Sequence, residues 1–484
     1  MKFRKITAVL SIVLTLHVGS AFPGMGDDLP SIGDSSGSVI SPEQEKKLGE
    51  AIMRSARQQL RIIDDPEINA YLHTLGYNLA SHSDNPGQSF DFFVIDDGSI
   101  NAFALPGGFI GVHSGLIMAA QSESELAAVL AHEMAHVTQR HMARAYENAG
   151  KLSIPTAAAI LAAILISTRN SQAGQAALAA TTAGNAQMQI NFTRLNEQEA
   201  DDIGIRVLAA SGFDPVSMPT FFERLQRATR YYGESLPEFL STHPVTTTRI
   251  AESRNRAEHY PRKPVSDSLS YQLTRARLRV LTADDPGKLV QDYAAQLKSG
   301  QYSNEAAWRY GYALSLEAAG RHNEARDLLT GLMAKDKQRL AYIIGLAQVE
   351  MGAKNSKLAL QLLSDALKLY PDNSALTLSY VNALLQDRQP KAAHDILQAH
   401  MRHNQISPDL YTLLARAAGD AGYSSQAHEA QAEYFYLNGD VDSAIAQLEK
   451  AAQSPKMDFY QSSRIESRLQ QFKQEALEAR KVSE

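Results

Sequence analysis

Two histidines four residues apart, with a glutamate beside the first, are the residues of this sequence best suited to chemistry. They are His132, Glu133 and His136, in the pattern His-Glu-x-x-His. On a helix, positions four apart lie one above the other, about 6 Å apart along the axis, so both imidazoles can reach one ion. Zn²⁺ takes nitrogen ligands at about 2.0–2.1 Å, and Glu133 can take a proton from a water bound to that ion. The pattern therefore predicts a zinc site for hydrolysis, with one ion per chain.

The stretch from Ser122 to Arg144 must hold these side chains on one helix. Ser122 and Glu125 form a capping-box pattern, which predicts a helix start with two of its amides satisfied. A chance match to so short a pattern falls more often in a loop or on a solvated face. Here, apolar residues at helical spacing predict a buried helix and favour a real metal site: Leu126, Val129, Leu130 and Val137.

A third metal ligand is expected from the acidic start of a later helix, which opens with Asn196–Asp201. Glu197 and Asp201 are four apart and share a helix face. Glu197 can complete a site of two histidines and one glutamate, with Glu199 as the reserve candidate. Asp201 can accept the other ring N–H of a ligating histidine and orient that ring. The alternative is a solvated acidic first turn that the helix dipole favours.

Two residues further along the chain are candidates to modify the site. His243 precedes Pro244 and is either a turn residue or an inhibitory fourth ligand, because a catalytic zinc keeps one position open for water. Arg249 follows on the next expected helix. It can stabilise a developing oxyanion, contact substrate or bind a carboxylate.

The segment before the metal-binding helix is expected to form two helices and a small sheet. Helices are predicted over residues 43–60 and 66–81, and a strand over 90–95. Residues 100–112 then predict a β-hairpin with Pro-Gly-Gly at its bend. Such a strand beside a metal site could bind an extended peptide through main-chain hydrogen bonds, or could simply complete the sheet.

Composition describes an ordinary globular chain of 484 residues, 44% hydrophobic and 21% charged. A formal net charge of −6 argues against non-specific binding to nucleic acid or to an anionic membrane. Residues 1–21 have the basic start, short apolar run and small-residue cleavage site of a secretory signal peptide, and residues 22–41 an extended lead-in. The chain has no cysteine, so disulfides and a lipidated cysteine are excluded. A soluble periplasmic protein is expected.

Residues 152–193 carry a single charge, Arg169. The 17 uncharged residues 152–168 reach the lower limit for a membrane span, but Pro155 and many alanines weaken that interpretation. No firm span is therefore predicted. Helices packed on the catalytic core, or a movable lid or a surface that meets a membrane or a partner, remain the alternatives.

The second half of the chain is a repeat array. Ala325, Ala359, Ala393 and Ala427 are each separated by 34 residues, which is the tetratricopeptide period. Such arrays bind peptides and proteins and carry no chemistry of their own. We therefore expect a mostly α protein: a signal peptide (1–21), an extended segment (22–41), an α+β zincin-type metalloprotease domain (42–260), a linker (261–268) and an α-solenoid (269–484).

The motifs of the first half, in this order and spacing, resemble those of the gluzincin metallopeptidases related to the CAAX prenyl proteases and the mitochondrial OMA-type proteases. The resemblance covers about residues 41–258 and rests on residues 101–108, the His-Glu-x-x-His motif, residues 197–201, and 242–244 with Arg249. Many of those proteins are embedded in membranes. This chain departs from them by lacking convincing spans, which favours an exported soluble member.

Signal peptide, peptidase half and repeat half together resemble periplasmic proteases of outer-membrane quality control. That resemblance implies a zinc endopeptidase that degrades misfolded or stalled outer-membrane proteins and assists their assembly. It also implies that the repeats bind these clients or the outer-membrane barrel-assembly machinery. The alternative is a non-proteolytic chaperone with a closed structural zinc site.

Overall fold

A computed structural model gives the fold for six stretches of the chain, namely residues 40–148, 194–232, 238–261, 265–404, 407–454 and 457–483. The expected signal peptide (1–21), the extended segment (22–41) except its last two residues, and the uncharged segment (152–193) lie outside the described residues. Within the described stretches, no helix combines the length and the apolar character needed to cross a membrane.

The first half combines helices with a small sheet, as expected. Ser41 caps the first helix and Asp65 the second, each with a proline at the first helical position. In chain order the elements are α1 (Pro42–Arg57), β1 (Ile62–Ile63), α2 (Pro66–Ala80), β2 (Asp91–Ile95), β3 (Ala102–Leu105), the 3₁₀ turn η2 (Pro106–Gly108), β4 (Phe109–His113), α3 (Ser114–Ala119), α4 (Glu123–Thr138), α5 (His141–Asn148), α8 (Arg194–Ala210), α9 (Ser217–Tyr232), α10 (Glu238–Thr242) and α11 (Thr247–Glu258).

The four strands form one sheet in the order β1-β2-β4-β3. Strands β3 and β4 pair antiparallel, from Ala102 opposite Val112 to Leu105 opposite Phe109, which confirms the expected hairpin. Gly107 and Gly108 at its bend have φ of 78° and 91°, values that favour glycine. Strand β4 also pairs parallel with β2. Because β3 is at the end of the sheet, its outer edge is free of any described strand.

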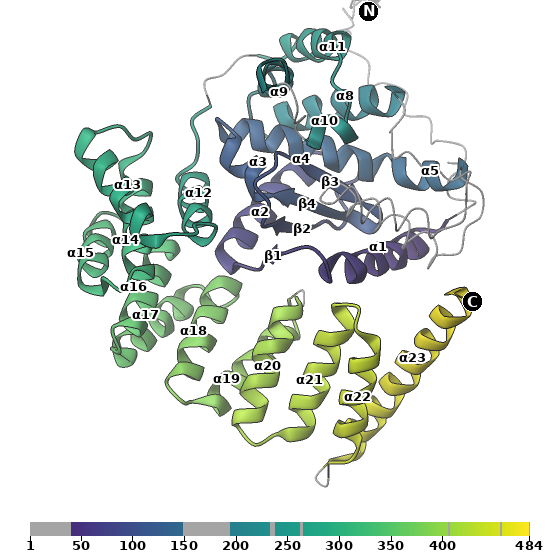
Figure 1. Cartoon of the computed structure of the whole chain (residues 1–484), viewed down its shortest axis with the longest axis vertical. Coiled ribbons are helices and arrows are strands. Elements are labelled where there is room, and N and C mark those ends of the chain that lie inside the picture. Colours follow the sequence, from purple (N-terminus) through teal and green to yellow (C-terminus); the bar gives the residue numbers. More distant parts are fainter. Residues whose placement is uncertain are drawn as a thin grey trace, which may run out of the picture.

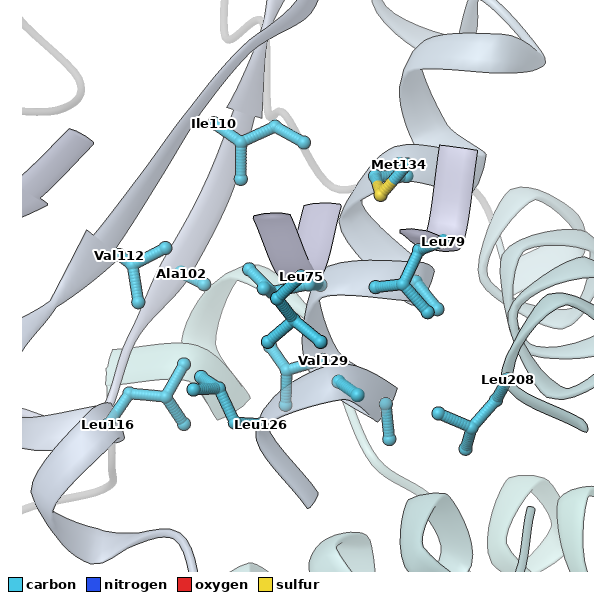
Figure 2. Close-up of a cluster of buried hydrophobic side chains, with 14 of the residues drawn as sticks. Leu75, Leu79, Ala102, Ile110, Val112, Leu116, Leu126, Val129, Met134 and Leu208 are labelled. Atoms are coloured by element: carbon cyan, nitrogen blue, oxygen red, sulfur yellow. The ribbon is translucent and has the colours of Figure 1, made fainter. Parts of the chain in front are cut away.

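The main core lies between this sheet and the helices α2, α4 and α8 (Figures 1 and 2). Helix α4 is buried along almost its whole length, so it passes through the centre of the first half. The following side chains from six elements meet in Figure 2: Leu75 and Leu79 (α2), Ala102 (β3), Ile110 and Val112 (β4), Leu116 (α3), Leu126, Val129 and Met134 (α4), and Leu208 (α8).

The second half is entirely helical in its described parts and curves beneath the first half (Figure 1). Its helices are α12 (Leu269–Leu281), α13 (Pro286–Ser299), α14 (Glu305–Ala318), α15 (His322–Lys335), α16 (Leu340–Gly352), α17 (Ser356–Leu369), α18 (Ser374–Gln386), α19 (Pro390–Met401), α20 (Pro408–Asp420), α21 (Ser424–Leu437), α22 (Val441–Ala452) and α23 (Phe459–Ser483). The 34-residue alanines lie at equivalent places in α15, α17, α19 and α21. The first three are fully buried, whereas Ala427 is only half-buried.

The same 34-residue period governs the turns between paired helices. Gly320, Lys354, Arg388 and Gly422 occupy equivalent turns, and their φ angles are 75°, 63°, 61° and 84°. A left-handed backbone costs a residue with a side chain roughly 1–2 kcal/mol, whereas glycine adopts it freely. The sequence shows glycine in only two of these turns, yet the backbone requires the same conformation in all four.

The halves are joined by a buried charged contact. Arg277 on α12 places Nη2 2.7 Å from Asp65 Oδ2 and Nη1 2.7 Å from Glu67 Oε1, at the start of α2. A second contact lies further along the array, where the Arg54 guanidinium of α1 is 4.9 Å from the centre of the Tyr436 ring of α21. The array therefore touches the first half near both of its ends.

We expect Arg388→Gly to raise the free energy of unfolding by about 0.5–1 kcal/mol, because relief of the left-handed strain exceeds the entropy that glycine loses on folding. Arg402→Gly is the matched control, since Arg402 also ends a helix at an exposed position but has φ of −73°. The control should lower stability. Urea unfolding followed by circular dichroism measures both, and a loss of stability in Arg388→Gly would contradict the strain argument.

Candidate metal centre

Helix α4 brings the central residues of the site into the core. The Ser122 side chain accepts from the Glu125 main-chain N–H at 3.2 Å, as the capping pattern predicts. The reciprocal bond differs from the prediction, because the Glu125 carboxylate accepts from the N–H of Gln121 rather than of Ser122. His132, Glu133 and His136 lie ten or more residues further along, and each is at most 1% exposed.

Helix α8 lies directly against α4 because a glycine permits the contact. A Cβ placed on Gly204 would lie 3.3 Å from the His132 main-chain nitrogen and 2.9 Å from Met218 Cε. A larger residue would therefore push the two helices apart. This close packing places Glu197, two turns earlier on α8, beside both histidines of α4. Nothing in the spacing of the sequence identified Gly204 as part of the site.

Four donor groups converge at one point. Their atoms, from His132, His136, Glu197 and His243, all lie within 4.8 Å of one another. The Nε2 atoms of His132 and His136 are 3.1 Å apart, and Glu197 oxygens lie 3.5 and 3.4 Å from them. His243 Nδ1 is 3.0 Å from Glu197 Oε1 and 3.4 Å from His132 Nε2. Corners of a tetrahedron with bonds of 2.0–2.1 Å would be about 3.3–3.4 Å apart, so this group fits a metal ion.

Carboxylates hold the other ring nitrogens of the two α4 histidines in place, one directly and one through a neighbour. Asp201 Oδ1 lies 3.0 Å from His132 Nδ1, where the sequence predicted it. His136 Nδ1 lies 2.7 Å from His141 Nδ1, and His141 Nε2 is 3.0 Å from Glu199 Oε2. Glu199, the reserve ligand candidate, is thus one residue removed from the donor group. His141 was missed, although its place five residues after His136 was visible.

Arg249 lies inside the cluster, 4% exposed, with its guanidinium above the Phe222 ring. Its Nε and Nη2 donate to the two oxygens of Asp201 at 2.5 and 2.8 Å, and Nη1 is 2.6 Å from Glu197 Oε2. Of the roles expected for Arg249, carboxylate binding is the one this geometry supports. The guanidinium holds the two carboxylates that contact the histidines.

Burial and charge shift the pKa values of these groups in opposite directions. Burial alone would lower the pKa of His132, but hydrogen bonds with Asp201 and Glu197 raise it to about 9. Burial would raise the pKa of Glu197, yet the surrounding histidines hold it well below its usual range. For His136, burial prevails and lowers the pKa. Glu197 is therefore held ionised, as a metal ligand must be.

Glu133 has a different environment from the other carboxylates. It is completely buried, and its oxygens have no close hydrogen-bond partner among the described side chains, although the main-chain N–H of Ala104 points towards it. The nearest ionisable partner is His243, whose Nε2 is 3.5 Å from Glu133 Oε1. Burial raises the pKa of Glu133, and His243, His132 and the main-chain N–H of Ala104 offset only part of the effect. A carboxylate with a raised pKa and unused acceptor positions is suited to general-base work.

The free edge of the sheet runs beside this glutamate. The His113 N–H donates to the Asn101 carbonyl at 3.0 Å, so the alternating pattern of an antiparallel pair directs the main-chain groups of Ala102 and Ala104 to the outer edge of β3. At the same edge, the Ile100 carbonyl accepts from the N–H of Phe239 at 3.2 Å. The segment that carries His243 is thereby attached to one end of β3.

Comparisons with known proteins agree with this geometry. The model of peptidase family M48 matches residues 66–257, and a tetratricopeptide-repeat model matches residues 350–417. The beta-barrel assembly-enhancing protease of Escherichia coli (strain K12) is 37% identical over 472 residues, covering 97% of this chain and 96% of that protein. The protein of the same name from Yersinia pestis is 35% identical over 472 residues, covering 96% and 97%. This chain belongs to the family of the beta-barrel assembly-enhancing proteases.

A more distant relative matches less than half of the chain. The mitochondrial metalloendopeptidase OMA1 of Arabidopsis thaliana is 30% identical over 216 residues, 44% of this chain and 41% of that protein. As a member of the beta-barrel assembly-enhancing proteases, the chain is a metallopeptidase with an α+β catalytic half followed by tetratricopeptide helices. The family, the enzyme class and the fold class expected from the sequence are confirmed.

We expect Asp201→Asn to weaken metal binding about 10- to 100-fold, because the His132 ring loses the carboxylate that orients it. Asp202→Asn is the matched control, since Asp202 is the next residue on α8 but its side chain is 64% exposed. Competition with a chelator, followed by metal analysis of the protein, measures the affinity. Equal metal retention in the two variants would contradict the orienting role of Asp201.

Proposed function

We propose that this chain is a zinc-dependent endopeptidase in which His132, His136 and Glu197 bind the ion. The donor set supports zinc, because two imidazoles and one carboxylate form a common catalytic zinc site. Charge supports a divalent ion: with the histidines neutral, as metal ligands must be, three buried carboxylates (Glu133, Glu197 and Asp201) and one guanidinium leave two negative charges to be balanced. When bound, the ion supplies a Lewis acid that makes a water molecule acidic and polarises the scissile carbonyl.

The residues of the chain divide the remaining work. Glu133 accepts the proton of the attacking water through a carboxylate oxygen and later delivers it to the leaving amine. Asp201 orients His132, and His141 with Glu199 orients His136. The second-half helices play no part in this chemistry.

Arg249 acts in this scheme as a positioning residue. Its guanidinium contacts the carboxylates of both Asp201 and Glu197 and so fixes their positions, and its positive charge offsets part of their negative charge. The sequence also allowed Arg249 to contact an oxyanion of the substrate. We favour the positioning role, because each guanidinium nitrogen already donates to Asp201 or to the Pro244 carbonyl.

An extended substrate would bind along β3. The outward main-chain groups of Ala102 and Ala104 are buried in this structure. Once uncovered, they would pair with a peptide irrespective of its sequence, which suits a protease of unfolded chains. The α10 segment supports a further proposal, since it holds one end of this edge and places His243 in the donor group. We assign His243 the role of an inhibitory fourth ligand, which must leave before substrate enters.

The substrates proposed are misfolded or stalled outer-membrane proteins of the periplasm. The names of the relatives, which refer to β-barrel assembly, support this choice, as do the predicted signal peptide (1–21) and a protein-binding repeat array. We place the peptidase domain at residues 42–260 and the array at 269–484, joined by the linker 261–268. The array would bind clients or the barrel-assembly machinery and so raise the local substrate concentration.

Glu133→Gln should retain the metal and lose cleavage by about 10²–10⁴-fold, because an amide cannot accept the proton. Casein and an unfolded outer-membrane protein serve as substrates, and zinc is measured in the same preparations. Glu43→Gln is the matched control, since Glu43 is a glutamate of the same half whose side chain is 78% exposed and far from the donor group in the chain. Loss of the metal in Glu133→Gln, or undiminished cleavage, would overturn the assignment.

His243→Ala should increase cleavage of an unfolded outer-membrane protein severalfold, because the fourth ligand position then remains open. His259→Ala is the control for loss of an imidazole, because His259 is an exposed histidine of the same half of the chain. The metal content should be unchanged in both variants. If wild type and His243→Ala are equally inactive although both bind zinc, the non-proteolytic chaperone with a closed structural site becomes the better explanation.

A further inference from the structure

A cavity of about 350 Å³ lies where the first half meets the start of the second, away from the metal ligands. Helix α12 forms one wall, and Figure 1 shows this helix between the peptidase half and the array. Met118 of α3 contributes from the first half, and Tyr293 and Trp308 of α13 and α14 from the second. A cavity of this size can hold the end of a peptide or a small molecule.

The charge lining this cavity is unusual for the chain. Arg275 and Arg279 line it from one face of α12, four residues apart, and no described lining residue is acidic. Three other cavities of the described parts each combine arginine with aspartate or glutamate. The overall net charge is −6, so a cavity whose charged lining residues are all cations stands apart from the average of the chain. It favours an anionic ligand.

Neither arginine is neutralised by its surroundings. Arg275 donates from Nη2 to the Met118 carbonyl at 2.8 Å, and no described carboxylate lies within 4.0 Å of it. Arg279 has Asp292 at 3.9 Å, with the two side chains 31% and 45% exposed. An exposed pair at that distance contributes little. Both guanidinium groups therefore keep most of their capacity to bind an anion.

Aromatic rings form the wall beside these charges. The rings of Tyr293 and Trp308 meet edge to face with centroids 4.8 Å apart. The Arg279 guanidinium carbon lies 5.1 Å from the Tyr293 centroid and 5.3 Å from the Trp308 centroid. The rings fix the cation in place, because they restrict the rotamers of an otherwise flexible side chain. An anionic group and an apolar group of one ligand, separated by only a few bonds, could thus be bound together.

We propose that this cavity binds the carboxyl terminus of a polypeptide whose last residue is apolar. The terminal carboxylate would lie between Arg275 and Arg279, and the last side chain against Trp308. A terminal residue suits the cavity because its carboxylate and its side chain share one carbon atom, which matches the short separation of cation and ring. Guanidinium groups bind carboxylates through paired hydrogen bonds. The proposal goes beyond the endopeptidase function, since it assigns a chain-end anchor that does not depend on cleavage.

The test measures binding of an unstructured decapeptide that ends in leucine to the full-length Glu133→Gln protein, so that no cleavage occurs. Trp308 is the only tryptophan of the chain, and its fluorescence therefore reports directly on the cavity. A labelled form of the peptide gives the affinity independently by anisotropy. We expect saturable binding with a change in Trp308 emission, and at least tenfold weaker binding when the peptide ends in an amide.

Variants locate the site on the protein. Arg279→Gln and Arg275→Gln should each weaken binding of the free-acid peptide at least tenfold. Arg309→Gln should not, because Arg309 is next to Trp308 but forms an exposed pair with Glu305. Thermal unfolding establishes that each variant is folded. Because the two arginines are replaced in separate variants, the test remains decisive if one of the two variants does not fold.

Three outcomes would overturn the proposal. Equal binding of acid and amide peptides would show that the terminal carboxylate is not recognised. Equal binding of an amidated peptide with an internal aspartate would indicate a site for any carboxylate and not for the chain end. Unchanged affinity in both arginine variants would place the peptide elsewhere on the array. None of these results bears on the catalytic role of the metal centre, which is measured by cleavage.

Discussion

The centre of the structure depends on one electrostatic constraint, which is that several ionisable groups share a volume without water. Two α4 histidines, His243 and three carboxylates lie within a few ångströms, all buried. Arg249 balances one negative charge, and a divalent cation bound by neutral histidines would balance the remaining two. Without such compensation, burial of these groups would cost free energy of folding. The charges lose their hydration, and lone pairs of neighbouring nitrogen and oxygen atoms would face each other with no proton or metal between them. The packing of α4, α8 and α11 is arranged around this requirement.

The close approach of helices is what makes that arrangement possible. Gly204 lets α8 touch α4, so Glu197 and Asp201 reach the histidines from one side. The α10 segment reaches them from another side and is attached to the edge of β3. The proposed extended substrate would pair with this same edge. The metal ligands, the edge of β3 and the position of His243 are therefore properties of one small region.

The second half packs directly against the first half. The buried contacts of Arg277 with Asp65 and Glu67 fix α12 on α2, and Arg54 meets Tyr436 further along the array. A buried ion pair specifies geometry more than it adds stability, since its members lose hydration on burial. The cationic cavity next to α12 lies at this junction, where a bound chain end would be held by both halves.

The sequence by itself determined the local features. Helical spacing predicted α4 with its two histidines and the shared face of Glu197 and Asp201, and the 34-residue period predicted the array. These are regularities between residues near one another in the chain. Only the tertiary structure decided which distant groups meet: His141 with His136, Arg249 with two carboxylates, Gly204 under His132, and a left-handed turn at Lys354 and Arg388. Such contacts follow from the packing of whole helices against one another. One added Cβ at a close contact would shift a helix and change which side chains meet, and the spacing of residues along the chain does not specify these contacts.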